Sequence, residues 1–281
     1  MTIAILFFIA LVKIYILLSI GYRCLTYRGR GSLMASFLLP KWQAHRGYHL
    51  SGVQENTLAS MRECKRRGSI MAECDVQVSS DGVVFLYHDA DLKRLHGDQR
   101  ALPKVKSTEL MALGLTTLEE VLVSDETPEK INIELKTAQI FDSKLERALA
   151  KLLNRLPHKK KILFSSFNPF SLMKLAVLRP EVPRALLACE EKVNWNKIFL
   201  RKLWLLPFCQ ADLLHLDQHM IRAEHVQLSR RRDLTLVAWT VNERSQWDRL
   251  EQIGVQFFIS DREPQFFSEA EDLARTPVRL F

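Results

Sequence analysis

Between residue 42 and residue 259, short apolar runs alternate with longer amphipathic stretches along most of the chain. Runs rich in Val, Ile and Leu are typical of buried strands, and the stretches between them carry apolar residues at helical spacing. Strand followed by helix, repeated this often, predicts a parallel sheet covered by helices. The first predicted strand ends at His45, and the others cover 70–78, 83–87, 131–135, 161–164, 184–187, 212–216, 234–240 and 256–259. The predicted helices cover 55–67, 117–123, 142–156, 169–177, 224–231 and 243–253.

The length of the alternating part helps to choose between two kinds of parallel sheet. The chain has 281 residues, and the 241 that follow residue 40 are close to the ~250 typical of a (β/α)8 barrel. The sequence contains no G-x-G-x-x-G and no G-x-x-x-x-G-K-[ST], so a nucleotide-binding doubly wound sheet lacks its signature. We therefore expect an α/β fold of the barrel type, with an irregular stretch over 88–115.

The N-terminal segment differs in character from the rest of the chain. Residues 2–22 read TIAILFFIALVKIYILLSIGY, and Lys13 is the single charged residue among them. A helix of this length spans about 31 Å, which is about one hydrocarbon thickness of a bilayer. No Lys or Arg precedes the run and no A-x-A-like site follows it, which favours a retained anchor over a cleaved signal peptide. We expect a transmembrane anchor over 1–25, with residues 2–22 in the membrane.

Basic residues follow the apolar run and predict its orientation. Arg23, Arg28 and Arg30 come directly after it. By the positive-inside rule, a single-pass protein of this kind places its large domain on the cytoplasmic side. Gly29, Gly31 and Pro40 indicate a juxtamembrane linker over 26–40 that includes a short amphipathic stretch, and the barrel domain then covers 41–281.

Charge and cysteine content restrict the partners and the compartment. The chain has 40 Lys+Arg and 32 Asp+Glu, and its net charge of +8 suits an anionic membrane surface or a negatively charged substrate. The basic runs 65–67, 159–161 and 230–232 are short and lack the interleaved aromatic residues of a single-strand binder, so we expect no nucleic-acid partner. Five cysteines without a C-x-x-C spacing argue against a disulfide framework or a structural zinc site and favour a reducing compartment.

Charged and imidazole side chains collect at the ends of the first predicted strands. They are His45, Arg46, Glu73, Asp75, His88, Glu134 and Lys136. Because residues i and i+2 of a strand point to the same side, Glu73 and Asp75 share a face, and Glu134 shares its face with Lys136. The carboxyl ends of the strands of a parallel barrel open on one mouth, where active sites lie. We therefore expect these side chains to converge there.

This set of side chains suits phosphodiester cleavage. Three carboxylates without a thiolate form a hard oxygen site for a divalent cation, Ca²⁺ or Mg²⁺. Arg46 and Lys136 can hold the anionic oxygens of a phosphate, and two histidines can serve as acid and base near neutral pH. Each residue alone also has an ordinary structural interpretation, such as a strand-end histidine or a surface ion pair. Buried strands, however, do not carry several inward carboxylates without a compensating cation.

At these residues the sequence resembles the glycerophosphodiester phosphodiesterase family. The matching text is AHRG at 44–47, ENT at 55–57, ECDVQVSSDGVVFLYHD at 73–89, NIELK at 132–136 and AWTVN at 238–242, and the resemblance covers most of residues 41–264. It implies a TIM barrel with a small insertion after the second histidine motif, which corresponds to the stretch 88–115. In this sequence the barrel is preceded by the transmembrane helix.

The resemblance also implies a role for each matching residue. His45 and His88 would be the general acid and base, Glu73, Asp75 and Glu134 the ligands of the divalent metal, and Arg46, Lys136 and Trp239 the substrate-binding residues. Trp239, at the end of the seventh barrel strand, has a role in the barrel core as its alternative. Glu55 would approach the site, and we expect Asn56 to cap the helix that follows it. Gln54, His96 and the ending FFISD at 257–261 depart from the family pattern without removing a proposed catalytic group.

The activity implied by the resemblance is metal-dependent hydrolysis of glycerophosphodiesters to an alcohol and glycerol 3-phosphate. One histidine would take the proton of the glycerol 2-hydroxyl, the other would protonate the leaving alcohol, and water would open a cyclic phosphate. Direct attack by water, and either order of the histidines, fit the sequence equally well. Three alternatives remain: a lysophospholipase D that acts on membrane lysophospholipids, a phospholipase that releases the cyclic phosphate, and a non-catalytic membrane-tethered binding barrel.

Overall fold

The structure is a computed structural model that describes residues 2–156, 160–191 and 202–262. Within these residues, eight parallel strands form one closed sheet, and this confirms the TIM barrel expected from the sequence. The strands are β1 (Trp42–Ala44), β2 (Met71–Val78), β4 (Lys130–Leu135), β5 (Lys161–Ser166), β6 (Arg184–Ala188), β7 (Leu213–Asp217), β8 (Thr235–Trp239) and β9 (Phe257–Ser260). The barrel closes because β1 pairs with both β2 and β9. The last part of the predicted domain, 263–281, lies outside the described residues.

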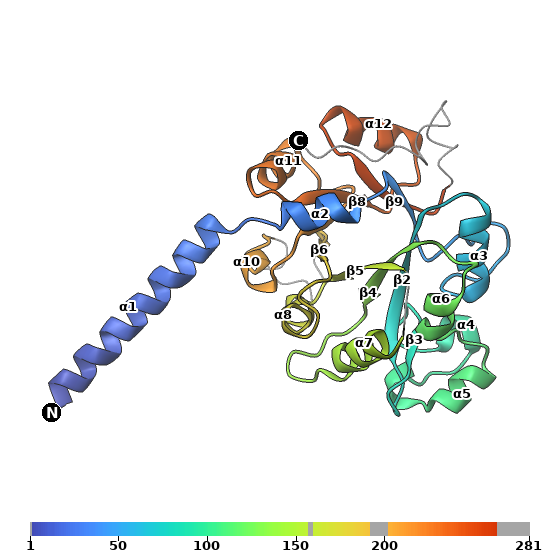
Figure 1. Cartoon of the computed structure of the whole chain (residues 1–281), viewed down its shortest axis with the longest axis horizontal. Coiled ribbons are helices and arrows are strands. Elements are labelled where there is room, and N and C mark those ends of the chain that lie inside the picture. The colour runs from blue at the N-terminus through green and yellow to red at the C-terminus, as the bar shows by residue number, and fades with distance from the viewer. Residues whose placement is uncertain (1, 157–159, 192–201, 263–281) are drawn as a thin grey trace.

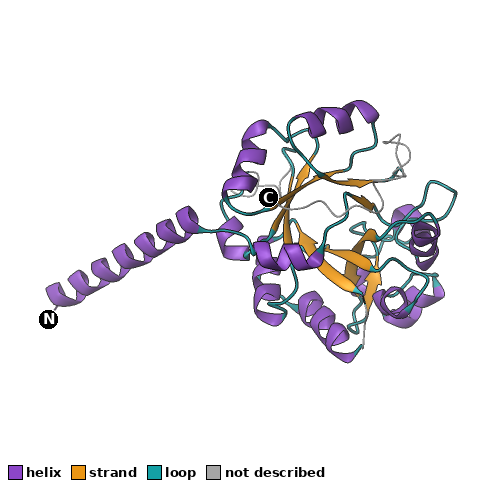
Figure 2. Cartoon of the chain, turned by 45° about the horizontal axis from the view of Figure 1, so that its top comes forward, coloured by secondary structure: helices purple, strands orange, loops and turns teal. Residues whose placement is uncertain are grey.

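Helices surround the closed sheet (Figures 1 and 2). They are α3 (Leu58–Arg66), α6 (Leu118–Val123), α7 (Lys144–Arg155), α8 (Pro169–Leu178), α10 (Leu206–Cys209), α11 (Ala223–Arg231) and α12 (Arg244–Gln252). On α7, for example, Leu145, Leu149 and Leu152 recur at helical spacing and are buried in the core between helices and strands. The same core contains the outward-facing strand residues Cys74 and Leu135, so the polar residues next to them point into the barrel.

The start of α3 differs from the prediction. Thr57, not Asn56, is the N-cap: its hydroxyl accepts a hydrogen bond from the Ser60 N–H at 3.1 Å, and the Ser60 hydroxyl accepts one from the Thr57 N–H at 3.2 Å. The Asn56 side chain points to β2, where its amide donates to Asp75 Oδ2 at 2.8 Å and its carbonyl accepts from the Asp75 N–H at 3.0 Å. The predicted capping role is wrong because this side chain is fully used by Asp75.

The insertion forms a small unit with a core of its own. After β2, the short strand β3 (Val84–Leu86) returns antiparallel to it. Then follow α4 (Lys93–His96), a 3₁₀ turn at Leu102–Lys104 and α5 (Ser107–Ala112). The apolar side chains of this unit pack in a separate cluster: Phe85, Tyr87, Leu92, Leu102, Val105, Leu110 and Leu115. The insertion therefore sits as a stable body beside the carboxyl end of β2.

A short helix closes the barrel at the amino ends of its strands. This helix, α2 (Gly31–Phe37), lies across the barrel in Figure 1 and belongs to the segment predicted as a linker over 26–40. Its Met34 and Phe37 pack on an apolar layer inside the barrel, formed by Met71, Leu163, Ala185, Leu213, Val237, Phe257 and Ile259. The Lys161 ammonium at the start of β5 donates to Ser36 O at 3.0 Å. The segment after the first helix is thus part of the barrel's packing.

Above this apolar layer the barrel interior is polar. Asn132 donates to Gln43 Oε1 at 3.3 Å and accepts from the Ser165 hydroxyl at 2.9 Å. His215 of β7 is fully buried and has no hydrogen-bond partner on either ring nitrogen among the described residues. Burial lowers the pKa of His215 to about 3, because a charged imidazolium is poorly solvated there.

The pKa of His215 predicts a loss of stability in mild acid. Between about pH 6.5 and pH 3 the unfolded chain binds a proton at this position that the folded chain does not, so the free energy of unfolding falls as the pH falls. Relative to a His215→Leu variant, the wild type should lose about 2 kcal/mol more between pH 7.5 and pH 5. Urea unfolding of the full chain in detergent micelles measures this. His219→Leu, at an exposed position, is the control, and parallel pH curves for wild type and His215→Leu would contradict the prediction.

The N-terminal segment forms a single long helix, α1 (Thr2–Thr26), that projects from the barrel (Figure 1). Within residues 5–26 an 18-residue window has a mean hydropathy of 2.3, and the helix is long and apolar enough to cross a membrane. None of this window is buried inside the protein. An apolar helix whose side chains are exposed over most of its length suits a lipid environment.

Candidate active site

Three acidic side chains meet at the carboxyl ends of two neighbouring strands. Glu73 and Asp75 come from β2, and Glu134 comes from β4, where it pairs in register with Asp75. One carboxylate oxygen from each residue lies within 4.8 Å of those of the other two. All three side chains are buried. The tertiary structure therefore brings the three predicted metal ligands into one cluster.

Two cations face these three carboxylates. The Lys136 ammonium lies 3.0 Å from Asp75 Oδ1 and 2.5 Å from Glu134 Oε1. Arg46 Nε lies 3.3 Å from Asp75 Oδ2, and the Arg46 backbone N–H donates to Glu73 Oε2 at 2.9 Å. One negative charge remains without a counter-charge within the cluster, and Glu73 Oε1 is buried without a hydrogen-bond partner in the described part of the chain.

The pKa values of the cluster reflect this imbalance. Burial, and then the nearby Asp75 and Glu134, raise the pKa of Glu73 well above its ordinary value. Burial also raises the pKa of Glu134, by more than Lys136 lowers it. For Asp75, burial alone would raise the pKa, but Lys136 and Arg46 outweigh burial and lower it. The cluster thus needs one more positive charge, which a proton on Glu73 or a cation can supply, and a donor set of carboxylate oxygens fits Ca²⁺ or Mg²⁺.

Each predicted catalytic histidine is held by an aspartate through the same ring nitrogen. His45, which follows β1, has its Nδ1 2.7 Å from Asp261 Oδ1. His88, which follows β3, has its Nδ1 2.8 Å from Asp89 Oδ1. A carboxylate on Nδ1 fixes the tautomer and leaves Nε2 for proton transfer. Both imidazoles act on the pKa of Asp75, so both lie close enough to the acidic cluster to share its field.

Asp261 is itself positioned by the loop after β8. Asn242 Nδ2 donates to Asp261 Oδ2 at 2.6 Å, and Asn242 Oδ1 accepts from the Asp261 N–H at 2.9 Å. Burial works to raise the pKa of Asp261, but the hydrogen bonds to His45 and Asn242 outweigh burial and lower it to about 2. Asp261 is therefore ionised at neutral pH and can stabilise a positive charge on His45.

Replacing Asp261 by Asn should slow the reaction without weakening substrate binding. An amide can present its N–H to His45 Nδ1 and hold the imidazole in the wrong tautomer. We expect kcat to fall about 10²-fold, with KM changed little. Steady-state kinetics on a diester of the class that the sequence resemblance implies measures this, with Asp248→Asn, on the exposed face of α12, as the matched control. An unchanged kcat for Asp261→Asn would remove Asp261 from the site.

A chain of ion pairs joins His88 to Arg46 around the mouth. Asp89 accepts from Arg94 Nε at 2.5 Å, Arg94 Nη2 donates to Glu55 at 2.5 Å, and Glu55 accepts from Arg46 Nη1 at 2.9 Å. The insertion supplies Arg94, through α4. Glu55 approaches the site, as expected from the sequence. The sequence analysis did not predict that Asp89 would hold His88 or that Arg94 would join Asp89 to Glu55. The histidine–aspartate dipeptide at 88–89 was the available signal for Asp89.

An aromatic pair lies beside the charged groups. Trp239, the last residue of β8, packs edge-on against Phe167, with ring centroids 5.5 Å apart and planes at 89°. The Lys136 ammonium lies 5.9 Å from the centroid of the Phe167 ring. Trp239 also packs partly on the apolar layer at the bottom of the barrel. Trp239 thus contacts both the Phe167 ring beside Lys136 and the apolar interior of the barrel.

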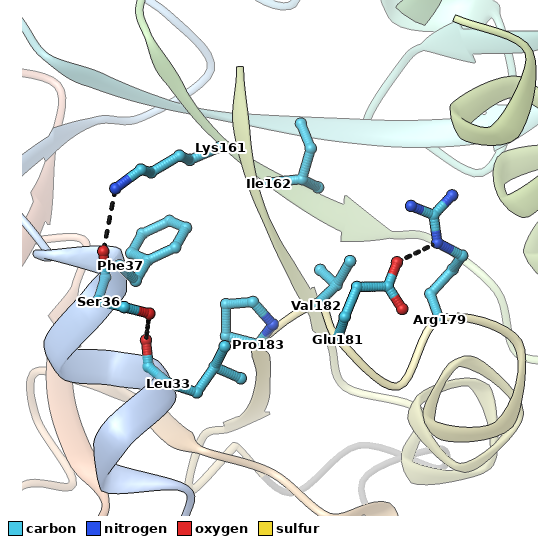
Figure 3. A pocket seen from close by; sticks show the side chains of 9 residues that line it. All are labelled: Leu33, Ser36, Phe37, Lys161, Ile162, Arg179, Glu181, Val182 and Pro183. Carbon is cyan, nitrogen blue, oxygen red and sulfur yellow. Dashed lines mark hydrogen bonds and ion pairs between the residues drawn. The ribbon is translucent and has the colours of Figure 1, made fainter. Parts of the chain in front are cut away.

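A hollow lies at the end of the barrel opposite the acidic cluster (Figure 3). It is formed between α2 and the amino ends of β5 and β6. Its polar groups are already paired: Lys161 with Ser36 O at 3.0 Å, and Arg179 with Glu181 at 2.6 Å. This hollow therefore offers little to a charged substrate.

Known proteins resemble this chain in sequence. Residues 45–263 match the model of the Glycerophosphoryl diester phosphodiesterase family. The chain is 26% identical over 234 residues to a glycerophosphodiester phosphodiesterase of Caldanaerobacter subterraneus subsp. tengcongensis, a match that covers 78% of this chain and 92% of that protein. It is also 26% identical over 240 residues to a glycerophosphodiester phosphodiesterase of Bacillus subtilis, covering 75% of this chain and 80% of that protein.

Solved structures agree with this relationship. A phosphodiesterase of Oleispira antarctica, solved in complex with the product sn-glycerol-3-phosphate, superimposes with a TM-score of 0.71 and 27% identity. That match covers 85% of this chain and 99% of the other. A glycerophosphodiester phosphodiesterase of Thermotoga maritima superimposes with a TM-score of 0.62 and 25% identity, covering 81% of this chain and 96% of the other.

Proposed function

Since this chain belongs to the glycerophosphoryl diester phosphodiesterase family and is a phosphoric diester hydrolase, we propose how the mouth of its barrel cleaves a glycerophosphodiester. The products are an alcohol and glycerol 3-phosphate. The observation that carries the proposal is the buried cluster of three carboxylates, with one positive charge too few, next to two aspartate-held histidines. Such a site suits a reaction in which a bound cation holds the phosphate and a histidine activates the hydroxyl that attacks it.

Substrate binding is assigned to the charged groups of β1, β2 and β4. Glu73, Asp75 and Glu134 would hold the divalent cation, which when bound supplies the positive charge that polarises the phosphoryl group and lowers the pKa of a nearby hydroxyl. Arg46 and Lys136 would face the anionic phosphate oxygens, with Arg46 held in place by Glu55. Trp239 would border the glycerol or the leaving group, because it packs against Phe167, and the Phe167 ring in turn lies next to the Lys136 ammonium.

Proton transfer is assigned to His45 and His88. One Nε2 takes the proton of the glycerol 2-hydroxyl as its oxygen bonds to phosphorus, and the other Nε2 gives a proton to the alcohol whose P–O bond breaks. The resulting cyclic phosphate is opened by water with the two roles exchanged, which restores both histidines and gives glycerol 3-phosphate. The aspartate on each Nδ1 supports this assignment, because it stabilises the imidazolium formed at each step.

The membrane is the proposed partner of α1. The helix suits a single span, and Arg23, Arg28 and Arg30 after it favour a barrel on the cytoplasmic side. A lysophospholipid is a second candidate substrate, since its headgroup is also a glycerophosphodiester and α1 would hold the enzyme at a bilayer.

An activity panel tests this function. We expect the full chain in detergent micelles to release choline from glycerophosphocholine in Ca²⁺ or Mg²⁺, to lose that activity in EDTA, and to regain it when the cation is restored. The same panel includes lysophosphatidylcholine, whose cleavage at the headgroup would establish the second candidate. Phosphorus NMR should identify glycerol 3-phosphate as the final product. Full activity in EDTA would contradict the metal assignment, and a cyclic phosphate as the final product would contradict the hydrolase.

A further inference from the structure

The last turn of α1, which ends near α10 and α11 in Figure 1, contacts α10 and the residue that follows α11. Arg23 Nε donates to Pro207 O at 3.1 Å, and the Arg23 guanidinium stands 5.7 Å from the centroid of the Phe208 ring. From the other side, Arg232 Nη1 donates to Cys24 O at 2.7 Å. The apolar helix therefore ends in contact with one edge of the barrel.

The residues that follow α1 hold this contact in place. The Tyr27 hydroxyl donates to Ala211 O at 2.6 Å. Arg30 makes a two-pronged ion pair with the buried Asp212, with Nε to Oδ1 at 2.7 Å and Nη2 to Oδ2 at 2.6 Å. At Gly29 a Cβ would come within 2.5 Å of Asp233 O, so the two backbones pack closely there. A helix attached in this way has a set direction relative to the barrel, because charge-assisted bonds to a buried carboxylate are strong.

The edge of the barrel next to α1 exposes apolar side chains. Trp204, just before α10, is 60% exposed, whereas the other described tryptophans are buried or partly buried. Val177, at the end of α8, is 81% exposed, and α8 packs on α10. An exposed indole beside the end of a membrane helix is typical of the interfacial aromatic belt of membrane proteins.

Basic side chains surround the same edge. Lys202 is exposed two residues before Trp204, and Arg23 is exposed in the last turn of α1. Arg28, just after α1, and Arg230 and Arg231, at the end of α11, are also exposed. Of these, Arg28 pairs with Asp233 at 3.0 Å. Cations close to a membrane surface are attracted to anionic headgroups.

We propose that the segment 202–208 and the end of α8 rest on the surface of an anionic phospholipid bilayer beside α1, with the Trp204 indole among the headgroups. The inference depends on α1 spanning the membrane, as proposed above, and goes beyond it, because a span alone leaves the barrel free to stand clear of the lipid. Three observations favour a lipid surface at this edge. The edge contacts the end of α1, it exposes apolar side chains, and its basic side chains are complementary to anionic headgroups.

Tryptophan quenching by brominated lipid tests the proposal. The full chain is reconstituted in nanodiscs of phosphatidylcholine and phosphatidylglycerol, with acyl chains brominated near the headgroup. We expect brominated lipid to quench a component of the wild-type fluorescence that is missing in Trp204→Phe, and iodide in the water not to quench that component. Equal quenching of wild type and Trp204→Phe by brominated lipid would overturn the proposal.

A matched control places a tryptophan at an exposed site far along the chain from this edge. Phe141, in the loop after β4, is 95% exposed, so Phe141→Trp in the Trp204→Phe background should be quenched by iodide and not by brominated lipid. From the same protein preparations, hydrolysis of glycerophosphocholine is measured in the nanodiscs, and co-flotation is measured with vesicles of the same lipids. Loss of flotation would overturn the membrane span together with this proposal, whereas loss of hydrolysis in the wild type would overturn the proposed function alone.

Discussion

Replacing Glu73 by Gln is expected to lower kcat/KM for glycerophosphocholine about 10³-fold or more and, in the absence of a divalent cation, to stabilise the folded protein. Activity falls because the substitution removes one of the three carboxylates proposed to hold the cation. Stability rises because Glu73 is the buried carboxylate without a counter-charge, and a neutral amide costs less to bury than an ionised group. One substitution should thus shift function and stability in opposite directions.

Steady-state kinetics and thermal unfolding in micelles check this prediction together. In EDTA the melting temperature of Glu73→Gln should lie above that of the wild type. Added Ca²⁺ or Mg²⁺ should raise the melting temperature of the wild type and leave that of the variant nearly unchanged, since binding stabilises only a protein that retains its site. Glu126→Gln, at an exposed ion pair with Arg62, is the matched control for loss of a carboxylate. A variant that keeps its activity or its response to the cation would contradict the role of Glu73.

Replacing either His45 or His88 by Ala is expected to reduce kcat for glycerophosphocholine by about 10²- to 10⁴-fold, the usual contribution of a positioned acid or base. The two variants should differ when the leaving group is p-nitrophenolate, which departs without a proton. The variant that lacks the general acid should then regain most of its rate, and the variant that lacks the general base should not. The comparison therefore assigns the two roles, which the symmetrical aspartate contacts leave open.

Glycerophosphocholine and the substrate with a p-nitrophenolate leaving group also test the role of Asp261. Asp261→Asn should follow the pattern of His45→Ala, because Asp261 acts through His45. His219→Ala, at an exposed position outside the site, should leave both substrates unaffected and serves as the control. Recovery by both histidine variants, or by neither, would contradict an acid–base pair divided between His45 and His88.

Much of the fold follows from periodicity that is local in the sequence. Strands such as KINIEL at 130–135 alternate outward apolar and inward polar residues, and this spacing of two was enough to place Glu134 and Lys136 on one side. The predicted strands and most helices accordingly agree with the structure to within a few residues. The predicted start of α3 was wrong because the Asn56 side chain forms its hydrogen bonds with Asp75 and is not available to cap the helix.

The contacts that complete the site join distant parts of the chain. Asp261 lies 216 residues from His45, and they meet because β1 and β9 pair to close the barrel. Arg94 reaches Glu55 from the insertion, across 39 residues. Likewise, Arg30 finds its buried partner Asp212 only because α2 closes the amino end of the barrel. No local pattern records such pairs, since loop closure brings them together without any fixed spacing.

By itself, therefore, the sequence determined the barrel, the apolar helix and the inward set of carboxylates, histidines and cations, because strand and helix periods act between near neighbours in the chain. Only the tertiary structure decided which aspartate holds which histidine, how many charges the acidic cluster leaves unbalanced, and which edge of the barrel meets the end of α1. These outcomes depend on contacts between residues that are far apart in the chain, and these contacts form only when β1 pairs with β9 and closes the sheet.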